Sequence, residues 1–197
     1  VGFTGADQAA PILLDGLAKL EYRGYDSAGL AVQNAAGKIE VVKAKGRLRV
    51  LSDMTDGGRA VQGTCGIGHT RWATHGEPSV QNAHPHYSRD EKIAVVHNGI
   101  IENYQELKDR LVNRGYTFTS QTDTEVVAQL IDYYYTGEAA GDPLGAITRM
   151  MLHVRGSYAL GVLFADCPGV VYAVRKDSPL IVGRAETGNL IASDVPA

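Results

Sequence analysis

The sequence predicts an α+β fold in a single domain over residues 1–197, and three observations support this prediction. Strand-like segments both open and close the chain. Segments with apolar residues at helical spacing lie between them, as in sheet-and-helix sandwiches. The last four strand-like segments are joined by short turns, which favours antiparallel pairing.

The expected elements succeed one another without repeats or low-complexity segments. They are the end of a strand at 1–5, a helix at about 7–20, hairpin strands at 28–33 and 39–43, a short helix at 48–54, strands at 65–69 and 93–97, helices beginning at Asn103 and Thr122, a helix at 143–153, and a meander of strands at 157–165, 170–175, 180–183 and 189–192.

Capping residues predict where the helices start. Asp7 is placed to cap the first helix. Asn103 with Glu106, and Thr122 with Glu125, resemble capping boxes. Between the strands at 65–69 and 93–97 lies a long loop, and loops of this length in a compact domain are usually functional or mobile.

Composition narrows the class of protein. The net charge is −3 and no basic stripe stands out, which argues against nucleic acid as a partner. The longest apolar run, 158–165, is far too short to span a bilayer, and no signal peptide is visible. Cys65 and Cys167 make no disulfide framework, so we expect a cytoplasmic protein. No nucleotide-binding motif is present, and we expect no cofactor.

The stretch from Gly66 to Ser79 has an unusual composition for a core strand. It begins with small and apolar residues and then brings together two histidines, Arg71, the only tryptophan and two threonines. Such a mixture suits a loop that grips a small polar molecule. Arg71 is either a surface residue or a clamp for a carboxylate, for which a guanidinium is geometrically suited.

Two further positions allow two interpretations each. Asn98-Gly99 is either a tight turn, which the dipeptide alone favours, or a pair of donors for an oxyanion hole. Asp123 is either a carboxylate that stabilises the start of its helix, the interpretation favoured by the sequence alone, or a ligand for an ammonium group.

The histidines and cysteines are expected to be structural. His84 and His86 suggest a metal site, but Pro85 interrupts them and the spacing matches no metal motif, so histidines satisfied within the fold are favoured. Cys65 lies in an apolar strand and is expected to be a buried, inert thiol, whereas Cys167 is expected in a turn.

Several blocks of sequence, taken together, resemble one family. The matching motifs, in order, are Glu21-Tyr22-Arg23-Gly24-Tyr25-Asp26-Ser27-Ala28-Gly29, His69-Thr70-Arg71-Trp72-Ala73-Thr74-His75-Gly76, Asn82-Ala83-His84-Pro85-His86, His97-Asn98-Gly99-Ile100-Ile101-Glu102-Asn103 and Thr122-Asp123-Thr124-Glu125. Over nearly its whole length the chain resembles the glutaminase (class II glutamine amidotransferase) domain of the glucosamine-6-phosphate synthases, also called glutamine–fructose-6-phosphate aminotransferases.

The resemblance implies an N-terminal-nucleophile hydrolase fold, a four-layer α/β/β/α sandwich with two mainly antiparallel sheets. It also implies hydrolysis of L-glutamine to glutamate and ammonia by an N-terminal cysteine whose α-amino group is the base. The implied roles are an oxyanion hole at Asn98 and Gly99, a turn supporting the nucleophile at Arg23 and Gly24, contacts to the α-carboxylate by Arg71 and to the α-amino group by Asp123, a gate at Trp72, and a pocket lining of Thr74, His75 and Gly76.

The two ends of the sequence differ from the family pattern. The family begins Cys-Gly-Ile-Val-Gly, so the nucleophile is expected three residues before Val1, and the polypeptide as written is expected to be inactive. The sugar-isomerase domains that bind fructose 6-phosphate, and on which a homodimer mainly rests, are expected outside these residues. The alternative is a non-catalytic module that binds glutamine and regulates another activity.

Overall fold

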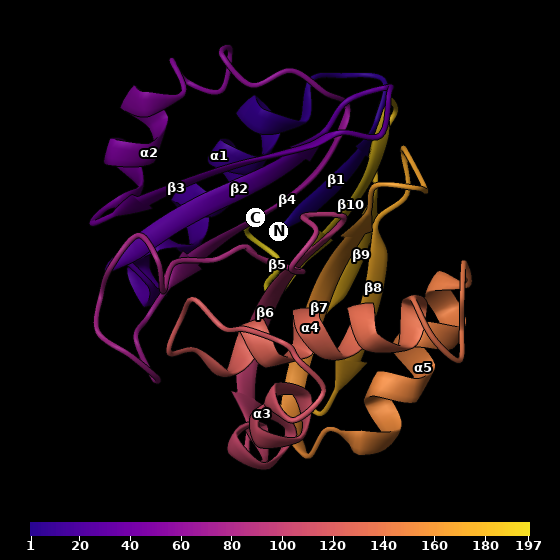
Figure 1. Ribbon diagram of the computed structural model, residues 1–197. Coiled ribbons are helices and arrows are strands. Elements are labelled where there is room, and N and C mark those ends of the chain that lie inside the picture. The colour runs from indigo at the N-terminus through magenta and orange to yellow at the C-terminus, as the bar shows by residue number, and fades with distance from the viewer.

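The computed structural model describes all residues from 1 to 197. Figure 1 shows strands and helices in close succession along the chain. The elements are β1 (Gly2–Gly5), α1 (Ala9–Leu20), the 3₁₀ turn Glu21–Arg23, β2 (Ser27–Gln33), β3 (Ile39–Lys45), α2 (Leu48–Met54), β4 (Cys65–Arg71), β5 (His86–Tyr87), β6 (Ile93–Ile101), α3 (Tyr104–Val112), α4 (Asp123–Tyr135), α5 (Pro143–His153), β7 (Gly156–Phe164), β8 (Tyr172–Lys176), β9 (Ile181–Arg184) and β10 (Gly188–Ala192).

The strands form two antiparallel sheets, as the short turns predicted. One has the order β3-β2-β4-β1-β10-β9 and the other the order β5-β6-β7-β8. The prediction of one continuous meander at the end of the chain was wrong, because β8 is the edge of the second sheet and β9 the edge of the first. The segment between them carries the chain from one sheet to the other.

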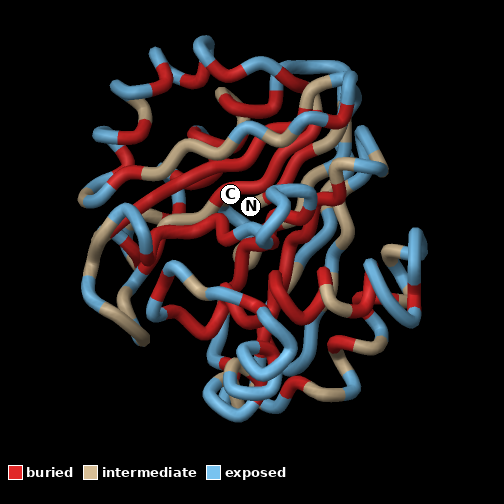
Figure 2. Tube along the Cα trace, viewed as in Figure 1, coloured by how far each residue is buried: buried red, intermediate tan, exposed pale blue.

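Three apolar clusters separate four layers. The first lies between α1, α2 and the six-stranded sheet, and includes Leu13, Leu17 and Leu30. The second packs α3, α4 and α5 on the four-stranded sheet. A thin third cluster, including Ile67 and Val96, lies between the two sheets. In Figure 2 the buried residues accordingly follow the strands and the inner faces of the helices.

Only one of the three predicted caps is present. Thr122 accepts a hydrogen bond from the Glu125 N–H and caps α4. Asp7 does not cap α1, which begins at Ala9, because the Gly63 carbonyl accepts the Ala9 N–H at 2.8 Å. Asn103 precedes α3, but its side chain makes no cap. It bonds instead to the backbone of His153 and Arg155, at the junction between α5 and β7.

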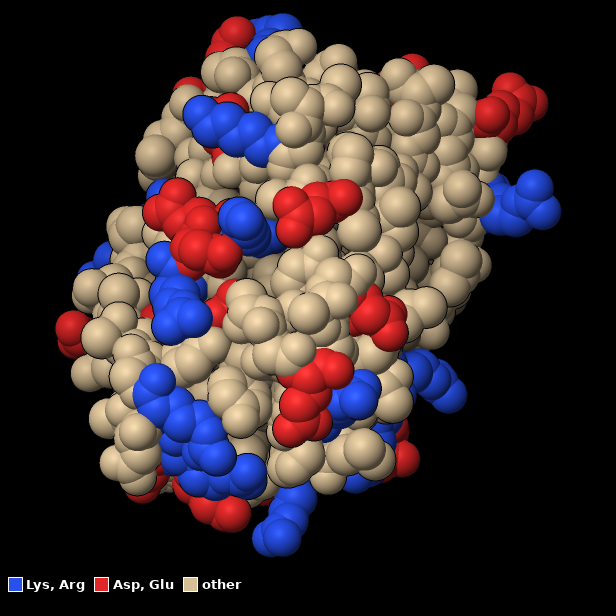
Figure 3. Space-filling view, turned by 45° about the vertical axis from the view of Figure 1, so that its right-hand side comes forward, with Lys and Arg blue, Asp and Glu red and all other residues tan.

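Charged side chains of both signs are interspersed over the face shown in Figure 3. None of the helices combines the length and the apolar character that crossing a bilayer requires.

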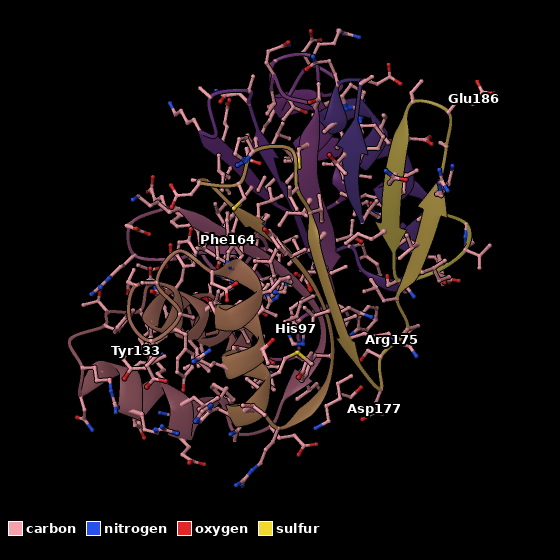
Figure 4. The ribbon with its side chains drawn as sticks, turned by 90° about the vertical axis from the view of Figure 1, so that its right-hand side faces the viewer. His97, Tyr133, Phe164, Arg175, Asp177 and Glu186 are labelled. Atoms are coloured by element: carbon pink, nitrogen blue, oxygen red, sulfur yellow. The ribbon has the colours of Figure 1, made fainter.

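Four histidines form a buried cluster between β4, β6 and the start of α4. His69 stacks on His84 with ring centroids 4.3 Å apart, and His86 and His97 also contact His84. Figure 4 shows His97 in the interior, whereas Arg175, Asp177 and Glu186 project outward near the edge strands β8 and β9.

Hydroxyl groups at the start of α4, on the capping residue Thr122 and on Thr124, hold this cluster. The Thr124 Oγ1 atom lies 3.0 Å from His97 Nδ1 and 3.2 Å from His84 Nε2, and Thr122 Oγ1 lies 2.9 Å from His86 Nε2. No group of three or more histidine, cysteine or acidic residues is arranged to hold a metal ion, so the metal alternative gains no support. The ring nitrogens His69 Nδ1 and His97 Nε2 have no hydrogen-bond partner, so the expectation of histidines satisfied within the fold holds only in part.

Burial keeps the cluster uncharged. It lowers the pKa of His69 to about 3 and the pKa values of His84 and His86 well below the usual value, and neighbouring cations and histidines add to the effect. Burial also lowers the pKa of His97, although Asp123 opposes the shift.

We predict that His84→Gln flattens the acid side of the stability profile. The folded pKa values lie below the unfolded ones, so the unfolded chain binds more protons once the pH falls below about 6.5. Each buried histidine then removes about 1.4 kcal/mol of stability per pH unit until its folded pKa is reached. The free energy of unfolding is measured with urea at pH 7.5 and at pH 5, and its dependence on pH gives the number of protons taken up on unfolding. At pH 5 this number should be smaller by about one in the variant. Equal uptake in the two proteins would contradict an uncharged His84.

Candidate functional site

A pocket of about 290 Å³ opens where the start of β1, the ends of β4 and β6 and the start of α4 meet. Every residue that the sequence proposed for the site lines it, except Gly24 and Gly76. The proposed residues that line it are Arg23, Arg71, Trp72, Thr74, His75, Asn98, Gly99 and Asp123. The fold thus joins segments that are distant in sequence.

Arg71, the last residue of β4, organises the loop that follows it. Its Nη2 group donates to the carbonyl oxygens of His75 and Gly76, the latter at 3.0 Å. Its Nη1 group reaches the Glu77 carbonyl at 3.5 Å. These bonds fold the chain after Trp72 back over the pocket. Arg71 is therefore not the surface residue that one interpretation allowed.

The charge of Arg71 is only partly compensated within the chain. The guanidinium is buried, and burial lowers the pKa of Arg71, which Asp26 and Asp123 partly offset. The Asp26 carboxylate lies 3.7 Å from Nη1, too far for a hydrogen bond, and the Nε–H group has no partner in the chain. Arg71 therefore brings an incompletely compensated positive charge to the pocket lining.

Asp123 is the first residue of α4 and lies buried on another side of the pocket. Its Oδ2 atom accepts the Ile101 N–H at 2.8 Å, which fixes the carboxylate against the end of β6. Its position at the start of a helix also stabilises its negative charge. Asp123 also lines the pocket, and its role as a ligand for an ammonium group stays a prediction.

Asn98 and Gly99 do not form the tight turn that the dipeptide alone favoured. They lie within β6, opposite Ala159 and Tyr158 of β7. Gly99 has φ of +130°, a conformation that L side chains rarely adopt, and a Cβ there would collide with the Ser157 carbonyl. Only a glycine therefore fits this position of the strand without strain. The Asn98 side chain makes no hydrogen bond within the chain and lines the pocket.

Arg23 and Gly24 form the turn beneath the start of β1. Arg23 bonds to the Ser193 hydroxyl and lies 3.8 Å from the Asp194 carboxylate. Gly24 packs directly on the end of β4, where an added Cβ would lie 2.7 Å from the Thr70 carbonyl. Gly24 therefore supports the site without lining the pocket.

The remaining proposed residues lie on the outer side of the pocket. Trp72 is 59% exposed, and its ring meets Tyr25 edge-on at 5.4 Å. His75 stands edge-on to Tyr104 at 4.9 Å. The exposed position of Trp72 at the rim is compatible with a residue that closes or opens a passage, and its role as a gate stays a prediction.

Neither cysteine belongs to the site. Cys65 is buried in the cluster between the sheets, and burial raises the pKa of its thiol, so it is a poor nucleophile at neutral pH. Cys167 lies in the turn after β7, as predicted.

No role was assigned from the sequence to three residues whose side chains support the pocket from outside its lining: Asp26, Asn82 and Gln121. Asp26 was seen only as part of a motif, and so was Asn82, whose side chain bonds to Glu77 and Gln121. Gln121 carries no chemical signal of its own. Their contacts depend on loops folding together, which no spacing pattern reports.

Known proteins match the chain over most or all of its length. A family model described as "Glutamine amidotransferase domain" matches residues 69–197. The glutamine–fructose-6-phosphate aminotransferase (isomerizing) of Caldanaerobacter subterraneus subsp. tengcongensis is 56% identical over 197 residues, which are 100% of this chain and 31% of that protein. A protein of the same name from Thermus thermophilus is 51% identical over 100% of this chain and 32% of its own length. The chain thus spans about a third of these curated relatives.

Solved structures share the fold. Glutamine phosphoribosylpyrophosphate amidotransferase from B. subtilis, complexed with ADP and GMP, matches with a TM-score of 0.82 and 26% identity, covering 98% of this chain and 41% of that one. The structure titled "allosteric regulatory enzyme of purine biosynthesis" matches with a TM-score of 0.81 and 27% identity, covering 98% and 41%. The four layers described above are thus those of an N-terminal-nucleophile hydrolase, and the chain belongs to the glutamine amidotransferase domain family.

Proposed function

We propose that residues 1–197 form the glutaminase domain of a cytoplasmic glutamine–fructose-6-phosphate aminotransferase, which hydrolyses L-glutamine to glutamate and ammonia. The ammonia passes to fructose 6-phosphate, which is held by sugar-isomerase domains elsewhere in a homodimeric full-length protein. One observation carries the glutaminase proposal: a buried cation, a buried carboxylate and a free amide donor, on Arg71, Asp123 and Asn98, line one small pocket. The printed names of the relatives support the sugar acceptor.

The pocket fits the charges of an α-amino acid. Arg71 faces the α-carboxylate of glutamine and Asp123 its α-ammonium group, so both charges that surround Cα are matched. The side-chain amide of glutamine then lies toward Asn98 and Gly99. Asn98 Nδ2 and the Gly99 N–H can both donate to the carbonyl oxygen, which becomes an oxyanion during attack.

A continuation of β1 would bring the nucleophile to this point. The pair Val1 and Gly68 exchanges both backbone hydrogen bonds, so the ladder between β1 and β4 is intact up to the first residue. In that register, a residue three positions before Val1 lies opposite Arg71, about 10 Å further along the strand. Gly24 packs on the same point of β4. The cysteine implied by the family pattern belongs there.

The reaction then proceeds in two steps. The cysteine sulfur attacks the amide carbon, its thiol proton passes through the α-amine to the leaving nitrogen, and the C–N bond breaks to give ammonia and a thioester. Water hydrolyses the thioester, releases glutamate and restores the thiol. A free α-amino group has a pKa of about 7.7–8.0, close to working pH, so a fraction of it is unprotonated and able to accept the thiol proton.

One prediction concerns the nucleophile. In the full-length gene product, mass spectrometry should find a mature N-terminal cysteine three residues before Val1, and its replacement by alanine should abolish glutamate production while glutamine still binds. Calorimetry measures the binding. A polypeptide that starts at Val1 should bind glutamine without turning it over. Turnover without that cysteine would refute the mechanism, and binding without turnover in the native protein would favour the regulatory module.

Another prediction concerns Arg71. In the full-length enzyme, Arg71→Ala should raise the KM for glutamine by about a hundredfold, the range expected for a charged hydrogen-bonded contact. Synthesis from free ammonia should remain largely intact, because ammonia does not use the clamp. An equal loss of ammonia-dependent synthesis would show that Arg71 acts on the fold as a whole.

Asp123 is tested by a substitution that changes charge and little else. Asp123→Asn keeps an oxygen for the Ile101 N–H but removes the negative charge. The KM for glutamine should rise about tenfold to a hundredfold. The KM for glutaramate, which lacks the α-amino group, should change little. If both substrates lost equally, Asp123 would not be the partner of the α-ammonium group.

A further inference from the structure

Asn82 lies outside the pocket lining, yet its side chain is almost fully buried, at 3% exposure. Both donors of its amide are used: Nδ2 bonds to the Glu77 carbonyl at 2.9 Å and to Gln121 Oε1 at 3.1 Å. Its Oδ1 atom accepts the Gln121 N–H at 2.9 Å. Three hydrogen bonds thus fix this one side chain between two loops.

The two loops carry opposite sides of the pocket. Glu77 ends the segment that Arg71 holds through its guanidinium. Gln121 precedes Thr122 and Asp123, at the start of α4. The amide of Asn82 is therefore a direct link between the segment that positions the cation and the segment that positions the carboxylate.

Gly76 shows how closely the parts fit. It has φ of +76°, and an added Cβ would lie 2.7 Å from Asn82 Nδ2 and 2.8 Å from Gln121 Cβ. The Arg71 guanidinium bonds to the carbonyl of the same glycine. Since nothing separates Gly76 from the amide pair, the pair sets how far the segment that Arg71 holds lies from the start of α4.

Asn82 is itself anchored from behind. Its N–H donates to Ser79 Oγ at 3.1 Å. The Lys43 ammonium, at the edge of the six-stranded sheet, bonds to the carbonyls of Gln81 and Pro85, each at 3.3 Å. The loop is therefore held to β3 on either side of Asn82, which gives the amide a fixed base.

We propose that Asn82 is a positioning residue that sets the spacing between Arg71 and Asp123, and through it the selectivity for an α-amino acid over a simple carboxylic acid. The inference rests on the proposed function, because it assigns the two charges to the two groups around Cα of glutamine. Asn82 touches no substrate; it acts through Gly76 and Gln121. A carboxylic acid without the α-amino group needs only the Arg71 side and is insensitive to the spacing.

Asn82→Asp in the full-length enzyme tests this inference. The new carboxylate keeps the acceptor for the Gln121 N–H, and the Gln121 amide can turn to donate to its second oxygen. That oxygen still faces the fixed Glu77 carbonyl oxygen, which pushes the Glu77 segment away. The KM for glutamine should rise at least about tenfold while kcat stays within about threefold. The KM for glutaramate should change less than about threefold.

A merely structural role gives another pattern. Loss of folded protein lowers the apparent kcat for both substrates equally and leaves both KM values unchanged. That outcome, or equal KM increases for glutamine and glutaramate, would overturn the inference. Asn34→Asp is the matched control. The Asn34 Oδ1 atom also holds a loop, by accepting the N–H groups of Ala36 and Lys38, but this loop is the β2–β3 turn. The substitution should leave the KM values for both substrates unchanged.

A second variant covers the case in which Asn82→Asp does not fold. Gln121 is exposed, so Gln121→Ala should fold, and it removes one partner of Asn82 and the support beneath Gly76. We expect a selective rise of the glutamine KM of about threefold to fivefold. An unchanged ratio of the glutamine KM to the glutaramate KM would contradict the proposal that Asn82 sets the spacing between Arg71 and Asp123. Calorimetry of glutamine binding by the unmodified protein distinguishes the two proposals. If the unmodified protein does not bind glutamine, the proposed function is refuted. If it binds glutamine but the variants show no selective effect, only the role of Asn82 is refuted.

Discussion

The buried guanidinium of Arg71 is the constraint on which the site depends. A cation removed from water needs acceptors, and an isolated one is costly to bury. Arg71 finds them in the carbonyl groups of His75, Gly76 and Glu77. No regular element includes these three residues, so the charge organises a loop that secondary structure leaves free. The group proposed to bind the substrate is thus the group that shapes the pocket.

The position of the Arg71 charge depends on β4, the strand that ends at Arg71. β4 lies in the middle of the six-stranded sheet, paired with β2 on one side and β1 on the other. The pairing with β2 places Ser27 opposite Arg71, and Asp26 just before it lies 3.7 Å from the guanidinium. The pairing with β1 places Val1 opposite Gly68, so a residue three positions before Val1 would lie opposite Arg71. Sheet register therefore decides where the cation and its counter-ion meet, and where the proposed nucleophile would join them.

The sequence predicts those features that depend on neighbouring residues and misses those that depend on residues far away in the chain. α2 and α5 have the predicted bounds because their apolar spacing and flanking residues are local. Asn98-Gly99 misled the turn prediction, since its strand continues to Ile101 and only the neighbouring β7 reveals why a glycine is needed. Asn103 likewise has a local capping pattern, but the backbone around His153 competes for its side chain. A local sequence pattern carries no information about hydrogen-bonding groups that lie far away in the chain.

The site residues show the same division. Arg71 and Asp123 stood out because charged groups at strand and helix ends are conspicuous, and the family resemblance assigned them roles. Asn82 and Gln121 have no such mark, because an amide becomes informative only when its partners are known. Gly76 could be read as a loop residue, but its tight fit over the amide pair follows only from the packed loops.

The uncharged histidines complete the electrostatic argument. His69, His84 and His97 line the pocket beside Arg71, and burial lowers the pKa of all three, so they add no positive charge at neutral pH. Were they protonated, a cationic wall would attract a carboxylate but repel an ammonium group next to it. Because they are neutral, the Asp123 carboxylate can balance Arg71 across the pocket. The buried cluster that loses stability in acid thus also leaves the pocket with the balance of charges that the proposed amino acid substrate requires.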